Sequence, residues 1–463
     1  MFKPETYSNR RDALRKEVKN GIILFPGNTE AAFNYPANTY HFRQDSTFSY
    51  FFGINQPDLA GIMDLDNGKD ILFGNDADMD DIIWMGPQPS IADRGQWAGI
   101  VHTQQLSGFE LYVKEALSGG RSVHFLPPYR GETRILLSTL LGIPLGDLKA
   151  AASAELIRGV VKLRCIKSEE EVREIEKMVD VAYLMHTTAM KMAHPGIVEQ
   201  EIAGTIEGIA LANAGPVSFP VILSMDGQTL HNHYHGNTLT EGRMLVVDTG
   251  CESEETLYAS DITRTVPVGG KFSQRQKEIY EIVLRANTEA IKAIRPGIPY
   301  REIHLLAAGV IAAGLKELGL MKGNVEEAVK QGAHAMFFPH GLGHMLGMDV
   351  HDLESVGENY VGYDEETVRS EQFGTAFLRL GRKLQPGFVL TVEPGIYFIP
   401  ALIDLWKAEG RCAEFINFDL AETYKDFGGI RIEDDVLVTE NGCRVLGKPI
   451  PKTVAEIEAL MAR

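Results

Sequence analysis

The sequence is poor in cysteine and lacks the long apolar runs of a membrane protein. Four cysteines occur among 463 residues, and none belongs to a Cys-x-x-Cys pair, which argues against a disulfide-stapled fold and against a sulfur-ligated metal. The N-terminus has no apolar signal segment, and no uninterrupted run of about 18 apolar residues occurs. We therefore expect a cytoplasmic protein that does not span a membrane.

An excess of basic residues is also absent. Lys and Arg number 45 against 63 Asp and Glu, so the net charge is −18. Phosphate backbones and anionic membranes repel such a chain, and no basic patch is visible, so neither nucleic acid nor a membrane is expected as a partner. With 44% hydrophobic and 23% charged residues, the composition is that of a globular protein. The length suits two or three domains.

The first part of the chain has the pattern of an α/β domain. Strand-like runs alternate with helical stretches; the strands are expected at 21–26, 60–66, 70–73 and 122–126, and the helices at 12–19 and 136–140. A different pattern begins at Ser168, where Ser168-Glu-Glu-Glu171 forms a capping box that opens an apolar-periodic helix to about residue 193. This change places the boundary between 150 and 167, and we predict domains at 1–155 and 156–463.

The second part predicts further helices at 199–213, 273–294 and 300–318, and it contains a weak internal repeat. Gly242 to Gly250 and Gly387 to Gly395 share the frame G-x-x-L-x-V-acid-x-G, with the acid six residues after the first glycine (248 − 242 and 393 − 387). Each frame is followed by a second acid-bearing segment. So short a frame also arises by chance, so duplication is one of two explanations.

The repeat supplies four carboxylates, Asp248, Asp261, Glu393 and Glu433, beside apolar strand residues. A single acid in such a place more often caps a turn or pairs with arginine. Four in paired frames favour a shared cation, because converging ionised carboxylates repel one another and are costly to bury.

Histidines could complete such a site. The run Pro339-His340-Gly-Leu-Gly-His344 precedes His351, and its glycines permit close backbone approach. No Glu follows His340, so the zinc-protease motif HExxH is excluded. A second cluster, His231-Asn-His233-Tyr-His235, would direct its three imidazoles to one face if it is extended. A structural role is the alternative for any one of these histidines.

Oxygen-rich ligation with one imidazole favours hard divalent ions, Mn(II) above Zn(II), although Co(II) and Zn(II) could also bind. The charges suit two ions, which would hold a hydroxide and polarise a carbonyl. This is hydrolase chemistry. Gly-x-Ser-x-Gly, a P-loop and a catalytic-cysteine signature are all absent from the sequence.

Five motifs in order resemble the proline-specific "pita-bread" metallopeptidases, prolidase and aminopeptidase P. They are Val247-Asp248-Thr-Gly, Ser260-Asp261-Ile-Thr-Arg, His340-Gly-Leu-Gly-His344 with His351-Asp, Thr391-Val-Glu393-Pro-Gly-Ile-Tyr, and Gly429-Ile-Arg-Ile-Glu433-Asp. Phe42-Arg-Gln-Asp-Ser-Thr-Phe also resembles the N-terminal domain of that family, which methionine aminopeptidases lack. The implied fold is α/β: an N-terminal α/β domain followed by a pita-bread catalytic domain, a duplicated α+β unit.

The resemblance also implies roles for individual residues. The ligands of two metal ions would be Asp248, Asp261, His344, Glu393 and Glu433. Asp261 and Glu433 would bridge the ions, and Glu393 would also shuttle the proton of the attacking hydroxide. His233 and His351 would hold the substrate and stabilise the oxyanion, Arg431 would order the centre, and His340 would line the proline pocket.

Three features bear on substrate and assembly. Arg379, 14 residues before Glu393 (393 − 379), matches the arginine with which prolidases bind the free carboxylate of proline; the alternative is a solvated arginine. Trp84 matches a tryptophan that reaches the partner's active site in a homodimer; the alternative is a core tryptophan. Phe219 stands where prolidases carry Tyr, which leaves fine substrate preference open.

The segment around Arg379, the insertion at 399–428 and the C-terminal end resemble the eukaryotic-type prolidase. We therefore expect Xaa-Pro dipeptides as substrates. The alternative is an aminopeptidase P that acts on longer Xaa-Pro peptides, and a remote one is a non-catalytic binding protein of the same fold.

Overall fold

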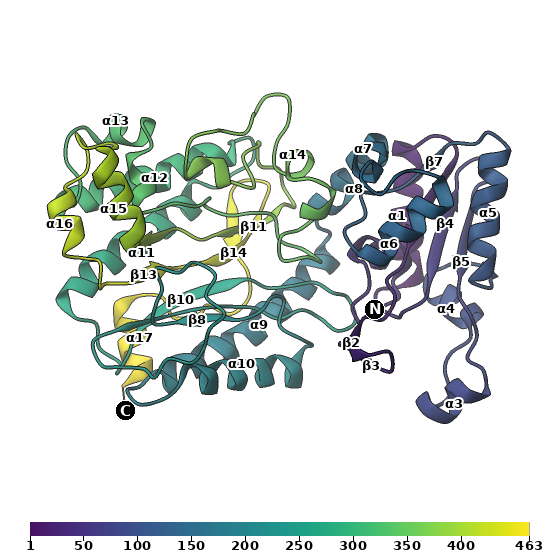
Figure 1. The fold of residues 1–463 in the computed structure, drawn as a ribbon, viewed down its shortest axis with the longest axis horizontal. Coiled ribbons are helices and arrows are strands. Elements are labelled where there is room, and N and C mark those ends of the chain that lie inside the picture. The colour runs from purple at the N-terminus through teal and green to yellow at the C-terminus, as the bar shows by residue number, and fades with distance from the viewer. Residues whose placement is uncertain (463) are drawn as a thin grey trace. The chain divides into compact units, whose positions relative to one another are not determined.

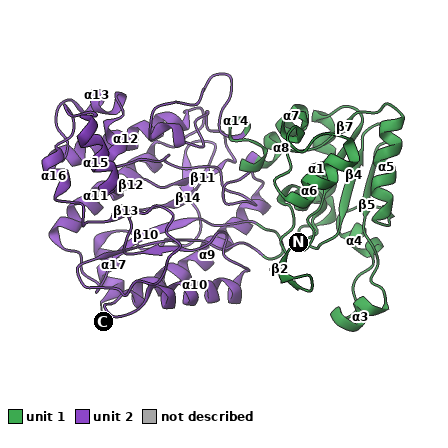
Figure 2. Ribbon diagram, viewed as in Figure 1, with its two compact units in different colours: residues 1–164, 254–257, 353–360 green, residues 165–253, 258–352, 361–463 purple. Residues whose placement is uncertain are grey.

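The computed structural model describes residues 1–462, which form two compact units (Figure 2). Unit 1 comprises residues 1–164, 254–257 and 353–360, and unit 2 comprises the rest of the chain. The predicted boundary between 155 and 156 lies inside helix α8 (Ala154–Cys165), whereas the two units divide after Arg164. Among the described residues, no helix is long and apolar enough to cross a membrane.

Unit 1 is built on a five-stranded sheet in the order β6-β5-β4-β1-β7. The strands are β1 (Ile22–Pro26), β4 (Ala60–Asp64), β5 (Lys69–Phe73), β6 (His102–Gln104) and β7 (Val123–His124). Alternate residues of β1 face opposite sides, because side chains alternate along a strand. Ile22 and Leu24 join a core with Phe109 of α5 (Ser107–Ser118), whereas the ring of Phe25 packs at a tilt against Phe51 of α2 (Ser46–Phe52).

The remaining elements of unit 1 lie outside this sheet. They are α1 (Pro4–Glu17), the hairpin β2 (Ala32–Tyr35) and β3 (Asn38–Thr39), α3 (Met79–Met85), α4 (Ile91–Trp97), α6 (Gly131–Leu141), α7 (Leu148–Ala151), the 3-10 turn η2 (Glu354–Val356) and part of α14 (Glu358–Val361). Helix α3 buries no residue, and Trp84 on it is 83% exposed. The alternative of a core tryptophan is therefore wrong.

Each half of unit 2 begins with a pair of helices that is followed by strands. A helix pair, α9 (Glu169–Met192) and α10 (Glu199–Asn213), precedes β8 (Ile222–Ser224), β9 (Met244–Thr249) and β10 (Ile262–Pro267). A second pair, α11 (Gln274–Ala293) and α12 (Tyr300–Glu317), precedes β11 (Val389–Val392), β12 (Gly395–Tyr397), β13 (Gly429–Arg431), β14 (Asp434–Val438) and β15 (Cys443–Val445). Figure 1 shows strands of both halves running between the α9/α10 and α11/α12 helices.

Shorter elements complete unit 2. They are α13 (Val325–Lys330), η1 (Ala333–Met336), η3 (Thr375–Phe377), α15 (Pro400–Glu409), α16 (Phe418–Glu422) and α17 (Val454–Met461).

Local signals in the sequence were accurate where a side chain caps a helix. The capping box at Ser168 is confirmed, since its Oγ accepts from Glu171 N and the Glu171 carboxylate accepts from Ser168 N. A second box, at Ser273, opens α11. The first helix was placed too late, because it begins at Pro4 rather than near residue 12, with a proline suited to a first turn.

Two neighbouring segments of unit 2 form two successive strand ladders, and the pairing is interrupted at the same place in both segments. β11 pairs with β14 up to Val392 opposite Asp434, and β12 pairs with β13 from Gly395 opposite Arg431. Glu393 and Glu433 lie in the gaps between these ladders. The break therefore frees both acids from regular strand geometry while the flanking ladders hold their backbones in place.

Candidate metal centre and active site

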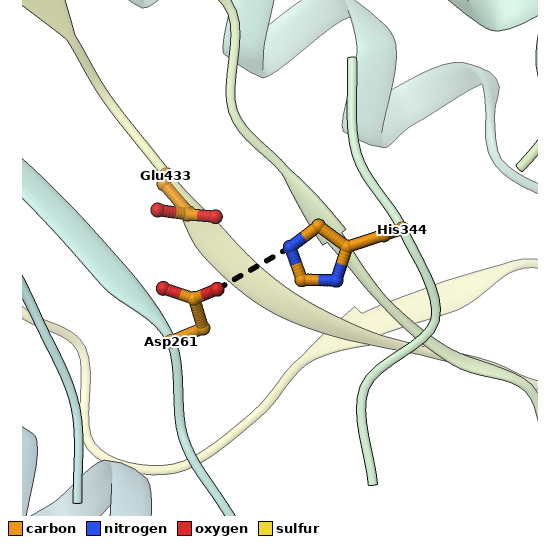
Figure 3. Close-up of side chains that lie close together, drawn as sticks. All are labelled: Asp261, His344 and Glu433. Atoms are coloured by element: carbon orange, nitrogen blue, oxygen red, sulfur yellow. Dashed lines mark ion pairs between the residues drawn. The ribbon is translucent and has the colours of Figure 1, made fainter. Parts of the chain in front are cut away.

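Three side chains from different elements meet at one point (Figure 3). Asp261 comes directly before β10, Glu433 lies between β13 and β14, and His344 belongs to the glycine-rich loop before β11. Each offers a ligand atom, and these atoms lie within 4.8 Å of one another. All three residues are buried, so the cluster is a candidate for binding a metal ion.

The other two expected ligands lie next to this cluster. Asp248 is on β9, the partner of β10 in an antiparallel pair that places Asp248 opposite Thr263. Asp248 lies close enough to Asp261 for its negative charge to help raise the pKa of that carboxyl group. Glu393 Oε1 lies 3.6 Å from His344 Nε2, and Asp261 Oδ2 lies 3.3 Å from the same nitrogen.

His344 is held by its backbone and its ring. Its N–H donates to Thr391 Oγ1, and its Nδ1 lies 3.0 Å from the Met345 carbonyl oxygen. A proton on Nδ1 donated to that carbonyl leaves the Nε2 lone pair directed at the carboxylates, which is the tautomer that a metal requires.

Arg431 connects the centre to its surroundings. Its Nη2 donates to Asp248 Oδ2 (2.6 Å), its Nη1 to the Tyr397 hydroxyl (2.9 Å) and its Nε to Thr263 Oγ1 (3.1 Å). Thr263 in turn donates to Glu433 Oε2 (2.6 Å). Burial opposes the charge of Arg431, but Tyr397 and the carboxylates outweigh it and raise the pKa of this guanidinium.

Neighbouring protein groups offset the remaining charges only in part. Burial first, and then neighbouring carboxylates, raise the pKa of Asp261 and Glu433 well above their usual values, and burial raises the pKa of Glu393 to about 7. Asp248 Oδ1 is buried with no hydrogen-bond partner. An orphaned carboxylate oxygen beside acids that resist ionisation fits a site built for divalent cations.

A cavity of about 1000 Å³ opens on this cluster. Its lining includes every predicted site residue of unit 2, namely His233, Asp248, Asp261, His340, His344, His351, Arg379, Glu393, Arg431 and Glu433. Trp84, which belongs to unit 1, is not among them. The lining also has apolar members that include Phe219, Phe373, Phe377, Ile399, Leu402 and Leu405. The cavity thus combines a polar cluster with apolar walls, as ligand sites commonly do.

Sequence reasoning missed part of this site. Of the three clustered histidines, His231 and His233 line the cavity and His235 does not. His233 Nδ1 lies 3.4 Å from the Val221 carbonyl oxygen, and His235 Nδ1 lies 3.0 Å from that of Leu223. The run of three histidines was the available signal, but it did not show that His231 also reaches the cavity.

Tyr397 was also missed, although it ends one of the motifs. Burial and Arg431 lower the pKa of His340 to about 3, so this imidazole is neutral. Its Nδ1 lies 2.8 Å from the Gly341 carbonyl oxygen and its Nε2 lies 2.9 Å from the Tyr397 hydroxyl. The tyrosine can therefore donate to His340 while it accepts from Arg431, which fixes the orientation of both side chains.

Comparison with known proteins identifies the class. The model of metallopeptidase family M24 matches residues 173–440, and that of the aminopeptidase P N-terminal domain matches residues 7–124. The chain belongs to metallopeptidase family M24. The expected enzyme class, a divalent-metal-dependent peptidase, is confirmed.

The most informative relatives cover nearly the whole chain. It is 33% identical to the Xaa-Pro dipeptidase of Homo sapiens, over 97% of this chain and 91% of the relative. It is 32% identical to the Xaa-Pro aminopeptidase of Escherichia coli, over 99% of this chain and 97% of the relative. The solved structure of a variant of E. coli aminopeptidase P in complex with substrate is similar to this chain, with a TM-score of 0.81 and 30% sequence identity. The match covers 99% of this chain and 98% of that one. The expected fold, an N-terminal α/β domain followed by a pita-bread catalytic domain, is confirmed.

The glycine-rich loop allows a direct test of how His344 is placed. A Cβ on Gly343 would lie 2.0 Å from the Thr391 carbonyl oxygen. Gly343→Ala must therefore push the loop away from β11 and move His344 from Asp261 and Glu433. We expect Mn(II) affinity, measured by calorimetry on metal-free protein, to fall by roughly 10- to 100-fold. Gly309→Ala, at a helical glycine with open space around it, is the control and should bind Mn(II) normally.

Proposed function

We propose that this chain hydrolyses the imide bond before proline and prefers Xaa-Pro dipeptides. The observation that carries the proposal is that Arg379 lines the same cavity as the carboxylate and histidine cluster. A guanidinium there can pair with the free carboxylate of a dipeptide's proline, which a longer peptide lacks at that position. The Xaa-Pro dipeptidases among the relatives support this substrate class.

The second candidate is an aminopeptidase P that acts on longer Xaa-Pro peptides. The Xaa-Pro aminopeptidase of E. coli, at 32% identity, favours it. In either case an enzyme dedicated to this bond has a physical reason, because the proline nitrogen in it carries no hydrogen and the φ angle of proline is restricted.

The proposed metal ligands are Asp248, Asp261, His344, Glu393 and Glu433, with Asp261 and Glu433 shared by two ions. Their oxygen-rich set favours Mn(II), and Co(II) or Zn(II) are alternatives; one structural relative is a Zn-substituted aminopeptidase P. When bound, such ions supply a hydroxide nucleophile at neutral pH and polarise the scissile carbonyl.

The protein groups of the cavity would do the rest of the work. Glu393 would accept the proton released by the nucleophile and pass it to the proline nitrogen. His233 and His351 would hold the substrate and donate to the oxyanion, and the neutral His340 would line the proline pocket. Arg431 would hold the Asp248 side chain in place through the 2.6 Å contact. A cytoplasmic location stays a prediction.

Removal of the metal should weaken the fold as well as the activity. Four carboxylates without cations repel one another, so chelation should lower the unfolding temperature and abolish Xaa-Pro cleavage, and Mn(II) or Co(II) should restore both. Thermal unfolding and Ala-Pro hydrolysis, measured on the same samples, check this. Full activity in protein shown to be metal-free would contradict the dinuclear assignment.

Arg379 should decide between the two substrate classes. If it pairs with the proline carboxylate, Arg379→Ala should lower kcat/KM for Ala-Pro by about 10- to 150-fold, the equivalent of a charge-assisted contact of about 1.5–3 kcal/mol. Mn(II) affinity should not change. Arg382→Ala, in the same segment but not among the cavity's lining residues, is the matched control. Cleavage of Ala-Pro-Gly-Gly as fast as Ala-Pro by the wild type would favour the aminopeptidase.

Trp84 should act through assembly. Its exposed ring on α3 is available to reach the active site of a partner in the proposed homodimer. Trp84→Ala should then raise KM for Ala-Pro while metal content stays at the wild-type level, and sedimentation should detect a dimer. Met85→Ala, at a neighbouring side chain that is 72% exposed, is the control. A fully active monomer would rule this role out.

A further inference from the structure

Where the strand pairing is interrupted, backbone carbonyl groups lose the hydrogen-bond donors that a regular strand ladder would provide. Val392 is the last residue of β11, and Ile432 follows the end of β13. Each immediately precedes a proposed metal ligand, Glu393 or Glu433. Buried carbonyls at such a break need donors from elsewhere, because an unpaired buried carbonyl is costly.

One side chain supplies a donor to both carbonyls. Asn287, fully buried on α11, directs its Nδ2 to the carbonyl oxygen of Val392 at 2.9 Å and to that of Ile432 at 3.4 Å. An amide NH₂ carries two hydrogens, so it can serve both acceptors at once. A single rigid group thus spans the two backbones that present Glu393 and Glu433.

The orientation of this amide is fixed by a cation. Lys452 Nζ lies 2.9 Å from Asn287 Oδ1 and 2.6 Å from Asp434 Oδ2. Since an ammonium group only donates, it must face the amide oxygen, and the amide nitrogen then faces the two carbonyls.

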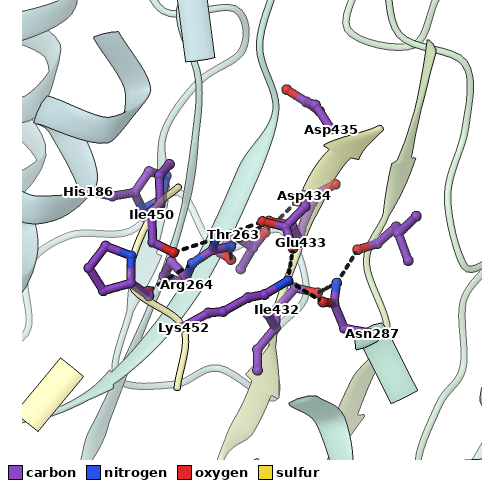
Figure 4. A network of polar contacts seen from close by, with 12 residues as sticks. His186, Thr263, Arg264, Asn287, Ile432, Glu433, Asp434, Asp435, Ile450 and Lys452 are labelled. Carbon is purple, nitrogen blue, oxygen red and sulfur yellow. Dashed lines mark hydrogen bonds and ion pairs between the residues drawn. The ribbon is translucent and has the colours of Figure 1, made fainter. Parts of the chain in front are cut away.

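The same hydrogen-bond network continues to Arg264 on β10 (Figure 4). Asp434 Oδ1 accepts from Arg264 Nη2 at 2.7 Å, and Arg264 Nη1 donates to the carbonyl oxygen of Glu433 at 2.6 Å. Arg264 also donates to the carbonyl oxygens of Ile450 and Pro451, which precede Lys452. Residues 450–452 therefore take part in this network through their carbonyl groups and the Lys452 ammonium group. The side chains of the network do not line the cavity.

We propose that Asn287 is a positioning residue that sets the separation of Glu393 and Glu433, with Lys452 orienting its amide, and that it thereby sets the affinity for divalent metal. This rests on the ligand assignment proposed above. Asn287 does not line the cavity and touches no substrate, so its effect should be on metal binding rather than on substrate binding.

The decisive variant is Asn287→Asp, which keeps the shape of the side chain and an acceptor for Lys452 but removes both donors. We expect Mn(II) affinity, measured by calorimetry on metal-free full-length protein well below its unfolding temperature, to fall by roughly 10- to 100-fold. The added negative charge would by itself favour a cation, so weaker binding points to geometry. Raised Mn(II) should restore kcat, with KM for Ala-Pro unchanged.

Tyr280→Phe is the matched control. Tyr280 is also buried on α11, and its hydroxyl donates to the Lys452 carbonyl oxygen at 2.8 Å, so the variant loses a buried hydrogen bond to the same segment without touching either ligand-bearing backbone. It should bind Mn(II) as the wild type does. Equal weakening in both variants would mean general destabilisation and would overturn the proposal, as would wild-type Mn(II) affinity in Asn287→Asp.

Lys452→Met keeps the proposal testable if Asn287→Asp does not fold. Loss of the orienting cation should also weaken Mn(II) binding, and unchanged affinity would overturn the role of Lys452. Because affinity is measured without peptide, this outcome is separate from the proposed function. Wild-type protein that binds Mn(II) but cleaves no Xaa-Pro peptide would contradict the function and leave the positioning role standing.

Discussion

Repulsion among buried carboxylates is the constraint on which the catalytic unit depends. Asp248, Asp261, Glu393 and Glu433 all line one cavity, and burial raises the pKa of three of them. Such a cluster is unfavourable unless cations compensate it, so the protein must hold the acids together against their own charge. The repeated helix pairs and strands meet this need, because each half contributes two of the acids from adjacent strands.

The surrounding residues share this task. Arg431 balances Asp248, Thr263 donates to Glu433, and Asn287 with Lys452 and Arg264 joins the backbones behind the cluster. Close approach also matters: a Cβ on Gly250 would lie 1.8 Å from the Ser260 carbonyl oxygen, so only glycine allows β9 to lie this near the segment that carries Asp261. The arrangement of the proposed metal ligands is thus a property of the packed unit rather than of five separate side chains.

Substrate choice depends on other parts of the cavity. The sequence identity is 33% to a dipeptidase and 32% to an aminopeptidase, so sequence similarity does not favour one activity over the other. The apolar walls include Ile399, which directly precedes helix α15, and Leu402 and Leu405 on that helix. Arg379 also lines this cavity, and under the proposed function its guanidinium would separate the two substrate classes.

Local signals were enough to predict the long helices of unit 2, the capped start of α9, and which acids and histidines belong to the motifs, because capping, periodicity and motif spacing are local. The sequence by itself did not determine that Tyr397 connects His340 to Arg431, that His231 lines the cavity while His235 does not, or that Trp84 is exposed on α3. It gave no sign of Asn287 either, since nothing near that residue resembles a motif. These points follow from the tertiary structure, because each depends on which distant parts of the chain a side chain meets, or does not meet, once the chain has folded.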